Sequence, residues 1–168
     1  EPAIAVRQQL ACCAARWADD QAVPVINANI NRDIDNDDPY LPLLWWWAVE
    51  RHSVSGRAEV MKRFVRPSLW KSSLGRDVLL PRLIRRYAAE GADGFDSVAA
   101  LLAAAPDDAA RLRLWPFVLQ GWRDTPSGPA LDTRAALIRA HVLYQRVVSD
   151  WTANPDNLTV MEMAIAMG

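Results

Sequence analysis

The hydrophobic positions of this chain repeat with helical spacing along most of its length. In residues 2–18, apolar side chains recur three or four positions apart from Ile4 to Trp17, which is the period of one face of an α-helix. The same pattern returns between turn-forming residues, whereas the alternating pattern of strands is rare. The sequence therefore predicts an all-α protein, with further helices at 21–32, 39–52, 57–65, 73–90, 97–104, 107–122, 132–151 and from 155 onward.

The predicted helices are joined by short connections, which favours antiparallel packing of consecutive helices. Helical pairs recur roughly every 40 residues, a spacing typical of HEAT-like repeats. We therefore expect one domain over residues 1–168, built from stacked antiparallel helical hairpins in an α-α superhelix. The chain begins at Glu1 and is still in an apolar helical pattern at Met167, which indicates a solenoid fragment of a longer protein.

Proline, glycine and aspartate mark the ends of these helices. Pro81 lies inside 73–90 and should kink or split that helix, and Pro116 should bend 107–122. Gly91 is expected to end its helix in the left-handed conformation. Residues 125–129 are the clearest loop. Short acidic side chains are expected to cap helix N-termini, namely Asp19 or Asp20, Asp38, Asp96, and Asp107 or Asp108.

The most apolar predicted helix carries three consecutive tryptophans, Trp45, Trp46 and Trp47. We expect it to run from Pro39 to His52, with the proline in the first helical position. Successive helical residues are turned by about 100°, so one neighbouring element cannot cover all three rings. Either flanking helices bury this helix on all sides, or one indole contacts another domain or a partner. The apolar run is shorter than the ~20 residues of a membrane span.

Composition excludes several classes of function. Hydrophobic residues make up 51% of the chain and the net charge is −1, which is typical of a globular domain and argues against a general nucleic-acid binder. The only cysteines, Cys12 and Cys13, are adjacent on a predicted helix, so they cannot easily form a disulfide with each other, and two cysteines alone do not make a zinc site. We expect them to be small, buried packing residues.

No catalytic, cofactor-binding or metal-ligating residues are predicted. Asp33, Asp35 and Asp37 alternate as in a calcium loop, but the glycine and the final glutamate of that motif are missing. The two histidines, His52 and His141, lie far apart in the sequence and are expected to be ordinary surface or helix-end residues. No catalytic triad order, paired-histidine motif or phosphate-binding glycine loop is present in the sequence.

Charge is distributed unevenly. The charged residues of 57–86 are mostly basic, and the charged residues of 19–38 are mostly acidic. These stretches are either solvated outer faces or docking surfaces for a partner of complementary charge. Arg85 and Arg86 could instead pair with the acidic loop within the domain. The predicted interaction surface consists of Trp45, Trp46, Trp47, Arg82, Arg85 and Arg86.

Three stretches resemble a known family. They are Glu1-Pro2 followed by Val6–Ala11, the run Asp35–Glu50 with its tryptophans, and Leu83–Ala88. Together they resemble the HEAT-like helical-repeat region of planctomycete-type membrane-bound dehydrogenases. In that family a β-propeller precedes the repeats and a c-type cytochrome domain follows them. The resemblance implies that this segment spaces or docks domains of an exported or periplasmic redox protein.

The same resemblance places the implied redox chemistry outside these residues. The haem-attaching Cys-x-x-Cys-His motif is absent, because Cys12-Cys13 has neither its spacing nor a following histidine. We therefore expect no cofactor in this segment, with c-type haem elsewhere in the parent oxidoreductase. The expected function is a non-catalytic helical-repeat scaffold or interdomain docking segment. The alternatives are an independent protein-binding α-solenoid with no redox role and, less favoured, a stand-alone enzyme.

Overall fold

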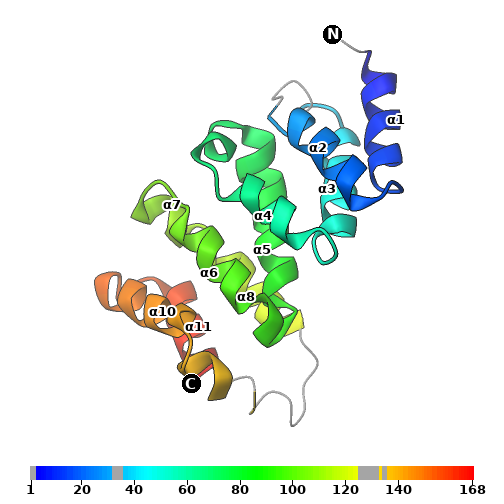
Figure 1. The fold of residues 1–168 in the computed structure, drawn as a ribbon. Helices are drawn as coiled ribbons and strands as arrows, with labels where there is room; N and C mark the ends of the chain where they lie inside the picture. Colours follow the sequence, from blue (N-terminus) through cyan, green and yellow to red (C-terminus); the bar gives the residue numbers. More distant parts are fainter. Residues whose placement is uncertain (1–2, 32–35, 125–132, 134–135) are drawn as a thin grey trace. The chain divides into compact units, whose positions relative to one another are not determined.

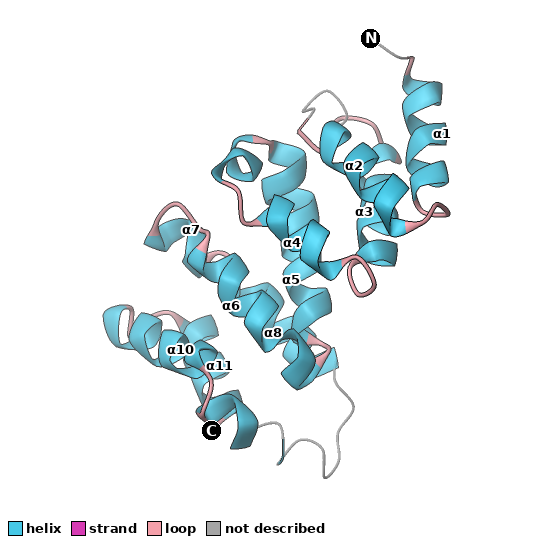
Figure 2. Cartoon of the chain, viewed as in Figure 1, coloured by secondary structure: helices cyan, strands magenta, loops and turns pink. Residues whose placement is uncertain are grey.

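The computed structural model describes residues 3–31, 36–124, 133 and 136–168, and it confirms the all-α class (Figures 1 and 2). Over this part of the chain there are ten α-helices and no strand. Their bounds are α1 Ile4–Ala14, α2 Asp19–Asn29, α3 Leu41–His52, α4 Arg57–Phe64, α5 Leu80–Ala88, α6 Phe95–Ala103, α7 Asp108–Leu112, α8 Trp115–Asp124, α10 Val142–Ala153 and α11 Leu158–Met167. The superhelical stacking stays a prediction.

The chain divides into two compact units, Glu1–Leu83 and Ile84–Gly168, and the division falls inside α5. The first unit contains α1 to α4, a 3₁₀ helix and a π-helical turn. The second contains the end of α5 and the helices that follow it. The single repeat domain over residues 1–168 stays a prediction.

Helix α3 is the centre of the first unit, because it packs against α1, α2, α4 and the π-helical turn. Its side chains Trp45, Ala48 and Val49 are fully buried. Three alanines lie on the faces that α1 and α2 turn inward, where small side chains allow helices to approach closely. They are Ala11 and Ala14 of α1 and Ala22 of α2.

Helix α3 begins two residues later than the sequence predicts. Its N-cap residue is Tyr40, whose side chain makes no capping bond. Asp38 Oδ1 instead accepts from the backbone N–H groups of Tyr40 (2.9 Å) and Leu41 (2.7 Å). These two bonds lower the pKa of the Asp38 carboxyl, because they favour its charged form. Asp38 therefore still satisfies the helix start, but from one turn outside it, and Pro39 precedes the helix.

The predicted helix at 73–90 is interrupted ahead of its proline. Residues Leu74–Leu79 form a π-helical turn, and α-helical bonding resumes in α5, where Pro81 is the second residue. Proline has no N–H to donate to the carbonyl four residues earlier, so a locally widened turn accommodates it. The predicted kink or split at Pro81 is confirmed as a change of helix type.

In the second unit α5 ends at Ala88, and Gly91 takes the left-handed conformation predicted for the end of this helix. Gly91 has φ of 66°, the left-handed conformation that glycine adopts without steric cost. In this unit α6 packs against α10, and α8 and α10 pack against α11. Phe95 of α6 stacks on Trp122 of α8, with ring centroids 6.1 Å apart. The predicted core stripe Trp115, Leu119 and Trp122 is buried, whereas Leu112 is half-buried.

Two long predicted helices are broken. The helix expected at 107–122 is divided into α7 and α8, since Pro116 is the second residue of α8, where a missing N–H is tolerated. Asp107 caps α7 as predicted, accepting from Ala110 N at 2.7 Å. The helix expected at 132–151 begins anew at Val142, because His141 Nδ1 accepts from Leu143 N (3.1 Å) and caps α10. The predicted loop at 125–129 lies outside the described residues.

Candidate functional site

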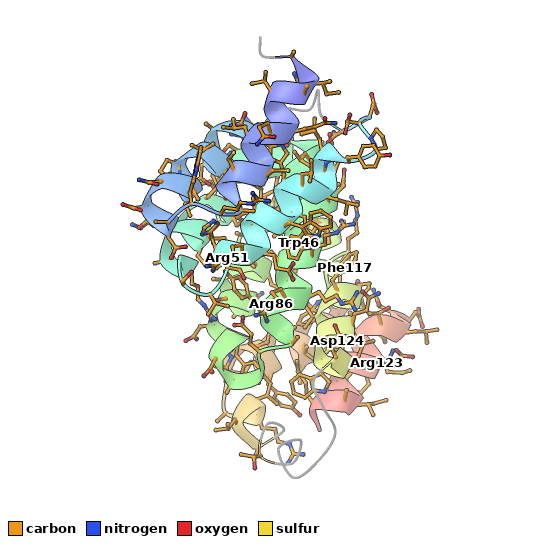
Figure 3. The ribbon with its side chains drawn as sticks, turned by 90° about the vertical axis from the view of Figure 1, so that its right-hand side faces the viewer. Trp46, Arg51, Arg86, Phe117, Arg123 and Asp124 are labelled. Carbon is orange, nitrogen blue, oxygen red and sulfur yellow. The ribbon has the colours of Figure 1, made fainter. Side chains whose placement is uncertain are left out.

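The three tryptophans of α3 have three different environments. Trp45 is fully buried, Trp46 is half-buried and Trp47 is 56% exposed. Among the described residues, the buried Nε1 of Trp45 has no hydrogen-bond partner. Figure 3 shows Trp46 among the side chains of this unit. Helix α3 is therefore a core helix that leaves one indole, Trp47, at the surface.

The predicted basic residues have partners close by in the sequence or within their own unit. Arg82, in the first unit, donates from Nη1 to the carbonyl of Val78 at 3.0 Å. In the second unit, Arg86 pairs with Glu90 at 3.2 Å. Neither contact involves the acidic loop that sequence reasoning offered as a partner, and residues 32–35 of that loop lie outside the described residues.

Arg85 forms a two-pronged ion pair with Asp124 of α8. Asp124 is labelled in Figure 3. The Nε–Oδ2 distance is 2.7 Å and the Nη2–Oδ1 distance is 3.2 Å. The pair lowers the pKa of Asp124 and raises that of Arg85, because each charge stabilises the other. This pair links α5 to α8 within the second unit, so Arg85 has a structural role in the contact between these helices.

His52 is a polar core residue that sequence reasoning missed. It ends α3, but its side chain is fully buried instead of lying at the surface. Its Nδ1 lies 2.5 Å from Asp19 Oδ1, and its Nε2 lies 2.8 Å from the carbonyl oxygen of Ala14. Asp19 consequently does not cap α2 as predicted. It lies in the first turn with its carboxylate turned toward His52, and the N-cap residue is Ala18.

His52, Asp19 and Ser55 have the residue types of a catalytic triad but not its connections. Ser55 Oγ donates to Asp19 Oδ1 at 3.1 Å instead of to the imidazole. The second imidazole nitrogen, which would act as the base, already faces the Ala14 carbonyl. The arrangement therefore joins α1, α2 and α3 through hydrogen bonds and does not activate a nucleophile.

A second buried polar cluster lies in the second unit around Asp150 of α10. Asp150 is only 2% exposed, and its carboxylate accepts from the Arg111 guanidinium of α7 at 2.8 to 3.2 Å. Trp115 Nε1 of α8 donates to Asp150 Oδ2 at 2.9 Å. The cluster joins α7, α8 and α10, because the Arg111 guanidinium and the Trp115 N–H both donate to the Asp150 carboxylate. Asp96, predicted to cap α6, instead faces His141 Nε2 at 2.9 Å, and Gly94 is the N-cap residue.

An apolar pocket of about 370 Å³ lies on the surface of the first unit along α1. Its lining comes from one helix and the turn after it, and consists of Ala5, Val6, Gln9, Leu10, Cys13 and Trp17. Cys12 and Cys13 are free and half-buried, not fully buried as predicted, because α1 packs inward through Arg7, Ala11 and Ala14. This face of α1 is therefore apolar and open to solvent.

A polar pocket of about 300 Å³ lies between α2 and α4 of the same unit. Basic and amide side chains dominate its lining, which consists of Asn27, Ala28, Asn31, Glu59, Lys62, Arg63 and Arg66. Arg63 is 7% exposed, and burial together with the nearby Arg66 lowers its pKa. The sequence places Lys62, Arg63 and Arg66 in a basic stretch. Only the pairing of α2 with α4 brings Asn27 and Asn31 beside them.

Neither a metal-binding cluster nor a membrane-spanning helix is found within the described ranges. No group of three or more histidine, cysteine, aspartate or glutamate residues there could hold a metal ion. Asp33 and Asp35 of the calcium-like stretch lie outside those ranges. None of the helices in the described part of the chain is both long and apolar enough to cross a membrane.

Comparison with known proteins adds no relative to this picture. No family model, curated protein or solved structure matches the chain. The resemblance to the repeat region of membrane-bound dehydrogenases accordingly rests on the three stretches of sequence named above. The pockets and the polar clusters are the features from which a function can be argued.

Proposed function

We propose that this chain is a non-catalytic helical scaffold that docks another part of a larger redox protein through the open face of α1. The apolar pocket along that helix is the observation that carries the proposal. Large apolar patches at a surface mark sites of protein contact more often than scattered apolar residues do. Val6 is 56% exposed and Trp17 38% exposed, so both ends of the pocket are accessible.

The shape of the pocket favours an apolar helix as its occupant. Val6, Leu10, Cys13 and Trp17 are three or four residues apart, so they form one stripe along the axis of α1 and the turn after it. A stripe of this kind accepts the apolar face of an antiparallel helix, as in helix-in-groove recognition. A helical pair packed there would extend the stacked arrangement that the sequence predicts.

A photo-crosslinking amino acid at Val6 tests the proposal in the full-length parent protein. We expect crosslinks to an amphipathic helix elsewhere in the same polypeptide, identified by mass spectrometry of the joined peptides. Val54 provides the control, since it is 52% exposed but outside the pocket. Equal crosslinking from Val6 and Val54, or crosslinks to non-helical segments, would contradict docking at α1.

The same experiment separates the proposal from its alternative. Crosslinks from Val6 to a helix of a separate protein, reproduced with purified components, would support an independent protein-binding module. Aspartate at Val6 should abolish the crosslink from a probe at Gln9 in either case, because the charge would be buried against apolar side chains. Circular dichroism should remain unchanged, since Val6 is exposed.

The redox parent is a separate part of the proposal, and the sequence resemblance supports it. The coding sequence on both sides of this segment provides the test. A β-propeller before it and a Cys-x-x-Cys-His motif after it would support a connecting segment in an oxidoreductase that carries c-type haem. Flanks that contain only further helical pairs would contradict the redox parent and leave the docking function of α1 intact.

A further inference from the structure

We propose that the polar pocket between α2 and α4 binds a phosphate-type oxyanion, either inorganic phosphate or the phosphate group of a small phosphomonoester. The pocket is distinct from the apolar face of α1. Its volume of about 300 Å³ lies at the lower end of the range for small-molecule sites. It is large enough for a phosphate that carries a short organic substituent.

Arg63 is the residue around which the pocket is organised. It lies on α4, and more than nine-tenths of its surface is buried. Ser68 Oγ accepts from its Nη1 at 2.9 Å, and Asn31 Oδ1 accepts from its Nη2, so both ends of the guanidinium are fixed. Its buried Nε has no hydrogen-bond partner among the described residues. A buried donor of this kind calls for an explanation, and a bound anion supplies one.

The charge of the pocket is positive. Lys62, Arg63 and Arg66 contribute three cations and Glu59 contributes one carboxylate. That carboxylate is 2.5 Å from Lys62, and both side chains are largely exposed, so the two charges offset each other. In the described part of the chain no acidic side chain pairs with Arg63 or Arg66, and burial of the Arg63 guanidinium together with repulsion from Arg66 lowers the pKa of Arg63. An anion between them would remove this repulsion and the cost of burying the guanidinium.

Guanidinium and amide donors suit an oxyanion better than other ligands. The planar fork of arginine matches phosphate oxygens, and charge-assisted bonds of this type are stronger than neutral ones. Asn31, which lines the pocket, uses its carbonyl oxygen on Arg63, so its amide nitrogen is left as a donor. A divalent cation would meet mostly positive groups here, and an apolar ligand would bury them at high cost.

Binding is tested on the whole chain with inorganic phosphate and glycerol phosphate, in chloride and acetate buffers of the same ionic strength. We expect saturable shifts of the Arg63 Nε–H resonance in nitrogen-15 NMR spectra. We also expect the melting temperature to rise by about 5 °C at about a hundredfold excess over Kd. Tighter binding of glycerol phosphate would identify a phosphomonoester, and equal binding would identify free phosphate.

Matched single-charge variants locate the site. Arg66→Gln should weaken phosphate binding about tenfold or more, because one charge-assisted hydrogen bond is lost. Lys71→Gln removes the same charge from an exposed position outside the pocket and should leave binding unchanged. Arg63→Lys keeps the charge but loses the fork, and it should also weaken binding. Equal effects of Arg66→Gln and Lys71→Gln would reduce the result to general screening and overturn the proposal.

A fourth variant tests whether other residues of the chain fill the pocket. Asp33→Asn/Asp35→Asn removes two carboxylates from the acidic stretch that follows Asn31 in the sequence. The proposal expects phosphate to bind the wild type and this variant with similar affinity. Binding by the variant alone would mean that the pocket is filled from within the chain. That result, or absence of binding to both proteins, would overturn the proposal.

Discussion

His52 Nδ1 and Asp19 Oδ1 lie 2.5 Å apart, joining the end of α3 to the start of α2 across 33 positions of sequence. Each imidazole nitrogen faces an oxygen atom, Asp19 Oδ1 on one side and the Ala14 carbonyl on the other. The bond from His52 is the main cause that lowers the pKa of Asp19 below its ordinary 3.8, and the bond from Ser55 adds to it. This contact therefore ties the stability of the first unit to pH.

Asp19→Ala should destabilise the protein at neutral pH by about 1–2 kcal/mol, because buried His52 loses an acceptor while solvent still screens part of the charge. A carboxylate whose pKa is lowered by folding contributes stability above its unfolded-state pKa. That contribution is lost as pH falls through the folded-state value. Urea unfolding from pH 7 to pH 3 should thus show the two proteins converging below about pH 4.

Asp20→Ala is the matched control for that measurement, since Asp20 is an exposed neighbour in the same helical turn. It should change the unfolding free energy by less than about 0.5 kcal/mol across the pH range. A constant difference between wild type and Asp19→Ala from pH 7 to pH 3 would rule out an ionised Asp19 as the stabilising partner.

The cluster of Asp150, Arg111 and Trp115 predicts a strongly non-additive set of variants in the second unit. Asp150→Ala should cost about 3–5 kcal/mol, because it leaves the Arg111 guanidinium and the Trp115 N–H without their acceptor. Trp115→Phe removes one neutral donor and should cost about 1–3 kcal/mol. Chemical unfolding at pH 7 measures both values.

The double variant Asp150→Leu/Arg111→Met and its two single variants, Asp150→Leu and Arg111→Met, form a thermodynamic cycle. The double variant removes both charges together. It should lose less free energy of unfolding than the sum of the losses in the two single variants. Additive free energies would show that Arg111 and Asp150 do not stabilise each other. The exposed pair of Arg123 and Glu162, 3.2 Å apart, serves as the control and should show coupling of at most about 1 kcal/mol.

The tryptophans of α3 should differ sharply in their contribution to stability. Trp45→Ala should destabilise the protein by about 3–5 kcal/mol, because it leaves a cavity in the core. Trp45→Phe should cost less, since the indole N–H has no partner in the described part of the chain. Trp47→Ala should change stability by about 0.5 kcal/mol or less, because the ring is largely exposed. Thermal unfolding followed by circular dichroism ranks the three.

Fluorescence quenching gives an independent check on the same assignment. Acrylamide should quench Trp47 in a variant that keeps it as the only tryptophan of the chain, with phenylalanine at the other positions, and it should barely quench Trp45 in the equivalent variant. Similar quenching of both rings would contradict the burial of Trp45. A loss of stability in Trp47→Ala as large as that in Trp45→Ala would do the same.

Local patterns in the sequence predicted most of the helices and a disturbance of the helix at Pro81 and at Pro116, but not the new start at Val142. The left-handed turn at Gly91 and the cap at Asp107 follow from residue chemistry within one turn. The start of α10 could not be predicted in that way, because His141 accepts a capping bond that histidine seldom makes. The apolar spacing continues across His141 without a break, so the sequence predicted one long helix over 132–151.

Polar contacts formed by tertiary packing were also beyond the sequence. Asp19 and Asp96 have the side chains of helix caps, but each one instead faces a histidine at least 33 positions away. The polar pocket between α2 and α4 depends on the pairing of these two helices, which no spacing of residues in the sequence reveals. Sequence reasoning found the basic stretch and placed an interaction surface at its residues Arg82, Arg85 and Arg86 and at the three tryptophans of α3, which stays a prediction.

The close approach of α8 to the end of α5 gives the last prediction. A methyl group added at Gly121 would lie 2.2 Å from the Arg85 carbonyl oxygen and 2.7 Å from the Ala88 Cβ. Alanine is a better helix former than glycine by about 1 kcal/mol. The clash with backbone should nevertheless win, so Gly121→Ala is expected to destabilise the protein by about 1–3 kcal/mol. Gln120→Ala, at an exposed neighbour, should be neutral or slightly stabilising. Urea unfolding of both variants decides the matter, because a stabilised Gly121→Ala would mean that the two helices are farther apart than the structure has them.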